Sequence, residues 1–230
     1  MNSILFLFFL LLASILPVIV LYLWVRRGNS ESSVQVTLPW FLGAFTAGIV
    51  SLLIAAFIQR FFPSIDSTDS PAPLFFYIFV TVALVEEISR LFTIFPLLKS
   101  SKSDRNRGFA AIVGFIAGLG FASAENALYG IGLTDLNIPI LRAFTAAPLH
   151  GACGIRIGAA LFFIKHRPIR AIFLILSAII IHGAYNLIID SPAIPEILAV
   201  PTALAALVIS LPMLKSDHEG ENHTFLPPRA

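Results

Sequence analysis

The chain has 230 residues, of which 57% are hydrophobic and only 12% are charged, and its formal net charge is +2. Soluble domains carry about 25% charged residues, so this composition excludes an ordinary soluble domain and predicts a protein that lipid solvates. The single cysteine, Cys153, excludes an internal disulfide, and we expect no nucleic-acid partner.

Seven apolar stretches follow one another along the chain, and each is long enough to cross a hydrocarbon layer of roughly 30 Å as a helix. The first is followed by Arg26 and Arg27 and has no basic residue before it, so we expect a retained helix and not a cleaved signal peptide. We predict an all-α integral membrane protein in which residues 1–214 form a single transmembrane domain. The predicted spans are residues 4–25, 38–58, 74–98, 109–133, 141–164, 171–189 and 197–214.

The basic residues between these spans indicate how the chain is oriented. Because lysine and arginine concentrate on the cytoplasmic side, we predict an N-terminus outside, a cytoplasmic C-terminus and a location in the membrane of a cell. Residues 215–230 are polar and are expected to form a disordered cytoplasmic tail. Of the 15 basic residues, 11 follow the first, third, fifth and seventh spans: Arg26, Arg27, Lys99, Lys102, Arg105, Arg107, Lys165, Arg167, Arg170, Lys215 and Arg229.

The four remaining arginines lie at or inside the spans. Arg60 and Arg142 are near the predicted outer ends, where long side chains reach the membrane surface. We interpret Arg142 and Arg156 as structural or lipid-facing anchors. Arg90 and Arg156 lie deeper in their spans, so both are expected to need partners.

Four spans also carry polar side chains at membrane depth. A charge at the bilayer centre costs about 2.5–3.5 kcal/mol on insertion scales, so we expect these residues to face one another inside the bundle. The third span has Glu86, Glu87 and Arg90, the fourth has Glu125 and Asn126, the fifth has His150, and the sixth has His182 and Asn186.

Spacing and depth both predict that these groups converge. Glu86 and Arg90 are four residues apart, and Glu87 and Arg90 are three apart, so each pair shares a helix face. At 1.5 Å per residue, the acids and histidines all lie roughly 10–20 Å below the predicted outer surface. Adjacent carboxylates cannot both ionise freely at that depth, so we expect Arg90, a metal or a bound proton to neutralise one of them.

Small residues in the fourth span favour close helix packing. Gly114, Ala117, Gly118 and Gly120 allow two backbones to approach, as in small-xxx-small interfaces. Such packing is expected to hold Glu125 against a neighbouring helix.

Four motifs in order, EEISR at 86–90, GFASAENALY at 120–129, RAFTAAPLHG at 142–151 and HGAYN at 182–186, resemble those of the PrsW family of intramembrane proteases. The resemblance covers about residues 74–190, which we interpret as the catalytic core. Arg90 stands where the family usually has Lys, Arg107-Gly108 where it often has Asp-Gly, and Asn186 where some members have Asp.

The resemblance implies a multi-pass protease of the bacterial cytoplasmic membrane, related to the CAAX-protease and bacteriocin-immunity superfamily. Well-known members cut a membrane-anchored anti-sigma factor near the extracytoplasmic side, so a membrane-anchored protein is the implied substrate. Carried over by motif, the catalytic residues are Glu86, Glu87, Glu125, His150 and His182. Arg90, Asn126 and Asn186 are expected to support them.

Two arrangements of these residues could hydrolyse a peptide. In the first, Glu125, His150 and His182 bind one divalent metal such as zinc, and Glu86 or Glu87 is the general base. In the second no metal is used: Glu86 or Glu87 acts with Glu125 on the water, and His182 with Asn186 binds the oxyanion. No HExxH motif is present, so the sequence leaves both open.

Two other functions remain alternatives. A proton-coupled transporter or channel could use the same Glu and His residues as a relay, although we find no repeated halves of the kind that transporters show. A catalytically silent relative could bind a membrane partner instead. The complete set of acids and histidines favours the peptidase.

Overall fold

The computed structural model describes residues 3–28, 36–63, 71–100, 106–134 and 136–215, and every regular element in these ranges is a helix. The predicted tail at 215–230 lies outside the described residues, apart from Lys215. Six helices are long and apolar enough to cross a membrane, which confirms an all-α membrane protein. They are α1 (Ser3–Gly28), α2 (Leu38–Gln59), α5 (Arg107–Leu133), α7 (Ala146–Phe163), α8 (Pro168–Asp190), and a segment over 196–214 that contains η2 (Glu196–Leu198), α9 (Ala199–Ser210) and η3 (Leu211–Leu214).

The predicted span at 74–98 is helical but not uniform. It consists of α3 (Pro71–Phe76), the π-helix η1 (Tyr77–Leu84) and α4 (Val85–Lys99), which follow one another without a break. A π-helix is rare and often lies at a functional site. Here it ends at Leu84, and only Val85 separates it from Glu86 and Glu87 in the first turn of α4.

The predicted span at 141–164 is wrong as a single helix. It is divided into α6 (Asn137–Phe144) and α7, with a break at Thr145, whose φ of −120° and ψ of −67° are not helical. Pro148 explains the break, because its ring clashes with the carbonyl four residues earlier and it has no N–H to donate. As a result, α6 and its Arg142 leave the axis of α7.

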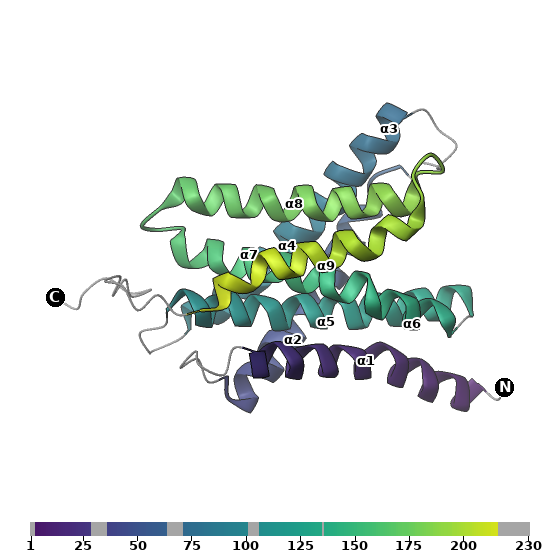
Figure 1. Cartoon of the computed structure of the whole chain (residues 1–230), viewed down its shortest axis with the longest axis horizontal. Coiled ribbons are helices and arrows are strands. Elements are labelled where there is room, and N and C mark those ends of the chain that lie inside the picture. The colour runs from purple at the N-terminus through teal and green to yellow at the C-terminus, as the bar shows by residue number, and fades with distance from the viewer. Residues whose placement is uncertain (1–2, 29–35, 64–70, 101–105, 135, 216–230) are drawn as a thin grey trace.

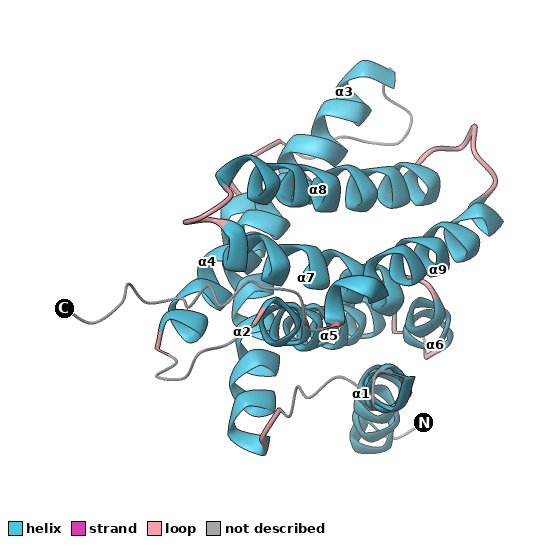
Figure 2. Ribbon diagram, turned by 60° about the vertical axis from the view of Figure 1, so that its left-hand side comes forward, coloured by secondary structure: helices cyan, strands magenta, loops and turns pink. Residues whose placement is uncertain are grey.

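The centre of the bundle is the pair α5 and α7, and every residue of α7 is buried. Figures 1 and 2 show α8 and α9 on one side of this pair, with α1 and α2 on the other. Large apolar side chains of α1, α2 and α8 remain exposed. Because they form the outside of a bundle of membrane-spanning helices, lipid is their natural solvent.

The ends of the helices agree with the predicted alternation of loops. Figure 1 shows the start of α1, the α5–α6 turn and the α8–α9 connection at one end of the bundle, and the end of α1, the start of α5, the α7–α8 turn and the end of η3 at the other. The second end carries Arg26, Arg27, Arg107, Lys165 and Lys215. The assignment of that end to the cytoplasm stays a prediction.

The predicted close packing of α5 is confirmed. A Cβ on Gly118 would overlap the backbone carbonyl of His150 in α7, and one on Gly114 would overlap that of Gly154. Gly120 meets Phe45 of α2 in the same way. These contacts leave no room for side chains, so they fix the distance between α5, which carries Glu125, and α7, which carries His150.

We expect Gly118→Val to lower thermal stability and to displace His150, because neither backbone can yield locally. Overpacking of a well-packed core costs about 1–3 kcal/mol, and here the obstacle is backbone. The control is Gly132→Val near the end of α5, where nothing lies within 4 Å of a Cβ. Thermal unfolding in detergent is the measurement, and equal melting temperatures for the two variants would contradict the packing argument.

Candidate active site

The first part of the site lies at the start of α4, where two carboxylates and an arginine are buried together. Glu87 and Arg90 have fully buried side chains and form an ion pair with an N–O distance of 2.5 Å. The other carboxylate oxygen of Glu87 lies 2.8 Å from Nδ1 of His182 on α8. Glu87 therefore joins α4 to α8, and it, not Glu86, is the partner of Arg90.

The second part lies where α5, α6 and α7 meet. Oε2 of Glu125 lies 2.5 Å from Nη2 of Arg142 and 2.9 Å from Nε2 of His150. Arg142 also donates from Nε to Asn126 Oδ1 at 2.9 Å, and its guanidinium lies over the ring of Tyr129. About 15% of the Glu125 side chain is exposed, against none of Glu87, so Glu125 is the more accessible of these two acids.

His150 connects the two parts. Arg90 Nη2 lies 3.2 Å from His150 Nδ1, and an arginine can only donate. Nδ1 therefore accepts, and the ring proton is on Nε2, which donates to Glu125. Phe121 covers this junction, with its ring against both Arg90 and the His150 imidazole.

Glu86 and His182 form the third part of the site, at the contact between α4 and α8. His182 Nδ1 faces Glu87, and His182 Nε2 lies 3.5 Å from Glu86 Oε2, where the two form an ion pair when the ring is protonated. That oxygen is buried and has no hydrogen-bond partner, while the other oxygen of Glu86 accepts from Gln59 at 3.1 Å. When the ring is neutral, Nε2 and Oε2 are both acceptors, and the space between them suits a cation or a donor such as water.

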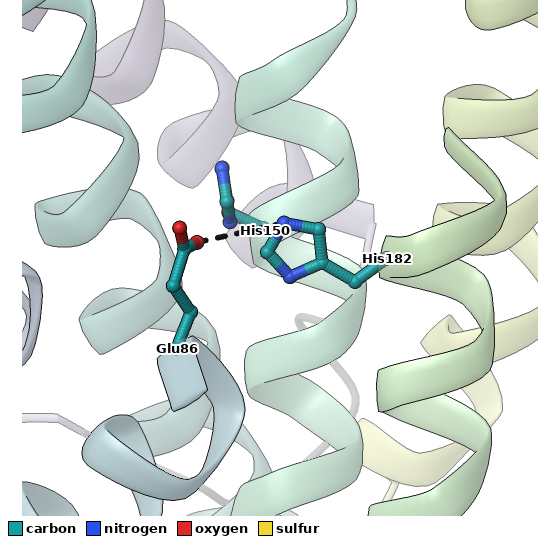
Figure 3. Close-up of side chains that lie close together, drawn as sticks. All are labelled: Glu86, His150 and His182. Atoms are coloured by element: carbon teal, nitrogen blue, oxygen red, sulfur yellow. Dashed lines mark ion pairs between the residues drawn. The ribbon is translucent and has the colours of Figure 1, made fainter. Parts of the chain in front are cut away.

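A metal ion fits this place. One ligand atom from each of Glu86, His150 and His182 lies within 4.8 Å of the other two, and Figure 3 shows the three side chains converging from separate helices. The contact from Glu87 to His182 Nδ1 is the carboxylate contact that orients metal-binding histidines. To serve as a third ligand, His150 would exchange its hydrogen bond to Arg90 or Glu125 for the ion.

All five predicted catalytic residues lie in this set of contacts, so they face one another inside the bundle as expected. Their catalytic role stays a prediction. The candidate ligand group in the structure contains Glu86, whereas Glu125 was the expected carboxylate ligand if a metal is bound. Glu125 pairs with Arg142 instead. Within the described part of the chain, no side-chain hydrogen bond joins Asn186 to the cluster. Its predicted supporting role therefore has no hydrogen bond in the structure to support it and stays a prediction.

Three contacts were not anticipated from the sequence. Gln59, the last residue of α2, donates to Glu86. The only feature of the sequence that could have indicated this contact is a polar amide at the end of an apolar span. Arg142 was interpreted as an anchor and instead pairs with Glu125. Arg156 is buried and not lipid-facing, because it donates to Ser177 and Ser210.

The sequence is similar to that of a known family of membrane proteases. The family model described as "PrsW family intramembrane metalloprotease" matches residues 36–214. Protease PrsW of Clostridioides difficile (strain 630) is 25% identical over 195 residues, covering 78% of this chain and 79% of that protein. Protease PrsW of Oceanobacillus iheyensis is 26% identical over 179 residues, covering 76% and 81%. The comparison with solved structures finds no match.

Proposed function

Because the chain belongs to the PrsW family of intramembrane metalloproteases, we propose that its buried Glu and His cluster hydrolyses a peptide bond in a membrane-anchored protein. The chain is a multi-pass membrane protein and a protease of that family. The observation that carries the proposal is the convergence of Glu86, His150 and His182 inside the bundle, where one carboxylate oxygen of Glu86 is buried without a hydrogen bond.

The proposed site of cleavage is the extracytoplasmic side of a bacterial cytoplasmic membrane, in a substrate of the anti-sigma-factor kind. Glu125 is in the last third of α5, toward the end of the bundle that lacks the basic loops. Arg142, on the short helix α6, lies at that same end. A site at this depth suits a substrate cut close to where it leaves the membrane.

The proposed ligands for a divalent metal are Glu86, His150 and His182. Two imidazoles and a carboxylate are a donor set that zinc accepts, with a position left for water. When bound, the ion would supply Lewis acidity. Gln59 and Glu87 are proposed to hold Glu86 and His182 in place, which is the role that outer hydrogen bonds have at metal sites.

The acid–base role is proposed for Glu125, because it is partly exposed and is not among the three converging ligands. In hydrolysis a water oxygen bonds to the carbonyl carbon, the C–N bond breaks, and a proton ends on the amine. Glu125 would take the proton from water and return it to the amine. Arg142 and His150 hold the Glu125 carboxylate, and the charge of Arg142 is available to a developing oxyanion.

The test is cleavage of a single-pass substrate by the purified protein in liposomes, combined with metal analysis. Wild type is expected to cleave and to carry a divalent ion. Glu86→Gln is expected to lose both, because an amide oxygen is a much weaker ligand than a carboxylate, and a chelator should inhibit wild type reversibly. Asp190→Asn, which removes an exposed carboxylate from the end of α8, serves as the control.

Cleavage by Glu86→Gln at the wild-type rate would show that the proposed ligand set is wrong. No cleavage by any form, accompanied by collapse of a pH gradient across the liposome, would favour the transporter instead.

A further inference from the structure

An apolar pocket lies next to the Glu125 side of the cluster. It is bounded by the ends of α5 and α8, by α6 and by the start of α9, which Figures 1 and 2 show at the same end of the bundle. Its volume is about 360 Å³, which falls in the range of roughly 300–1,000 Å³ typical of ligand sites. Its apolar wall consists of Leu133, Leu141, Ile189, Ile197, Ala199 and Val200.

The pocket and the cluster share a wall. Arg142 lines the pocket and reaches Glu125 at 2.5 Å, and Glu125 in turn contacts His150. Thr145 and Tyr185 also line the pocket, and the Tyr185 hydroxyl donates to Thr145 at 3.0 Å, which closes the wall between α7 and α8. A group in the pocket is therefore one side chain away from Glu125.

We infer that this pocket binds an apolar side chain of the substrate, immediately beside the scissile peptide bond; the inference rests on the proposed function. The lining of the pocket and the nature of the proposed substrate both indicate an apolar side chain. The polar lining residues are Arg142, Thr145, Tyr129 and Tyr185 on the side of the cluster, and Glu196 at the start of η2. The rest of the wall is apolar, so an apolar side chain fits the wall and the polar peptide attached to it fits the shared end. A membrane-anchored substrate supplies such residues next to its cleavage site.

Cross-linking tests occupancy without requiring cleavage. The chain's one cysteine, Cys153, is buried, so an introduced cysteine on the pocket wall is the reactive one. In a Glu86→Gln background, Ile189→Cys should form a disulfide with a single-pass substrate whose cysteine is next to the scissile bond. Ile180 lies on the same helix, is 59% exposed and does not line the pocket, so Ile180→Cys should give little or no cross-linked product.

Specificity is the second readout. Filling the pocket with Ile189→Trp should lower kcat/KM about 10–200-fold for a substrate with leucine at the cross-linked position, and less for one with alanine there. Ile180→Trp should change neither. If Ile189→Cys cross-links no better than Ile180→Cys, or if Ile189→Trp keeps the wild-type preference, the pocket is not the substrate subsite although the protease stands. If Ile189→Cys cross-links selectively to the substrate but the wild-type protein never cleaves it, the pocket does bind substrate and the proposed protease function is wrong.

Discussion

Replacing Glu125 with Gln is expected to lower kcat by about 10²–10⁴-fold, the usual contribution of a general acid–base group. The amide still accepts hydrogen bonds from Arg142 and His150, so the geometry of the site should be kept while the proton acceptor is lost. Metal content should stay at the wild-type level. Single-turnover cleavage and metal analysis of the same preparation are the measurements.

Metal content in this variant separates two assignments of Glu125. The sequence predicts Glu125 as a ligand if a metal is bound, whereas the structure brings Glu86 to the two histidines and leaves Glu125 with Arg142. If Glu125→Gln loses its metal while Glu86→Gln retains it, the sequence assignment is right and the proposed one is wrong. Asp190→Asn is the control, because it also removes a carboxylate, lies at the exposed end of α8 and leaves Glu125 intact.

Much of the site could be predicted because the cost of burying charge is local and large. Glu86, Glu125, His150 and His182 lie in spans that are otherwise apolar, and each would oppose insertion unless it faced the others. Counting residues from the outer end of each span then placed these side chains at a similar depth in the membrane. The glycines of α5 were predictable for a similar reason, since only residues without side chains permit such close backbones.

The pairing within the layer could not be predicted in the same way. Arg142 reaches Glu125 because the chain breaks at Thr145 and folds α6 back beside α5, and apolar content does not reveal a break inside an apolar stretch. Glu86, Glu87 and Arg90 all lie on α4, and α-helical spacing brings both acids within reach of Arg90, so spacing alone does not choose between them. The partners on other helices do not follow from spacing either: Gln59 of α2 donates to Glu86, while Glu87 meets Arg90 and His182 of α8.

Removing one partner of the Glu87–Arg90 pair is expected to have the largest effect on stability. Both side chains are fully buried, and breaking a buried pair on one side costs about 3–5 kcal/mol because the other charge stays without a counter-ion. Glu87→Gln and Arg90→Met should each show this loss in thermal or denaturant unfolding in detergent. Arg156→Met is the matched control, because Arg156 is buried but bonded to the hydroxyls of Ser177 and Ser210.

The double variant Glu87→Gln/Arg90→Met distinguishes a stabilising role from a functional one. With both charges removed, most of the lost stability should return, since neutral replacements of a buried pair are often tolerated. Metal affinity should not return, because a Gln amide is a weaker acceptor for His182 Nδ1 and the loss of such a partner typically costs about 10–100-fold. If the losses of the single variants simply add, Glu87 and Arg90 are not coupled. If stability and metal affinity recover together, the carboxylate of Glu87 serves only to neutralise Arg90, and His182 is oriented by something else.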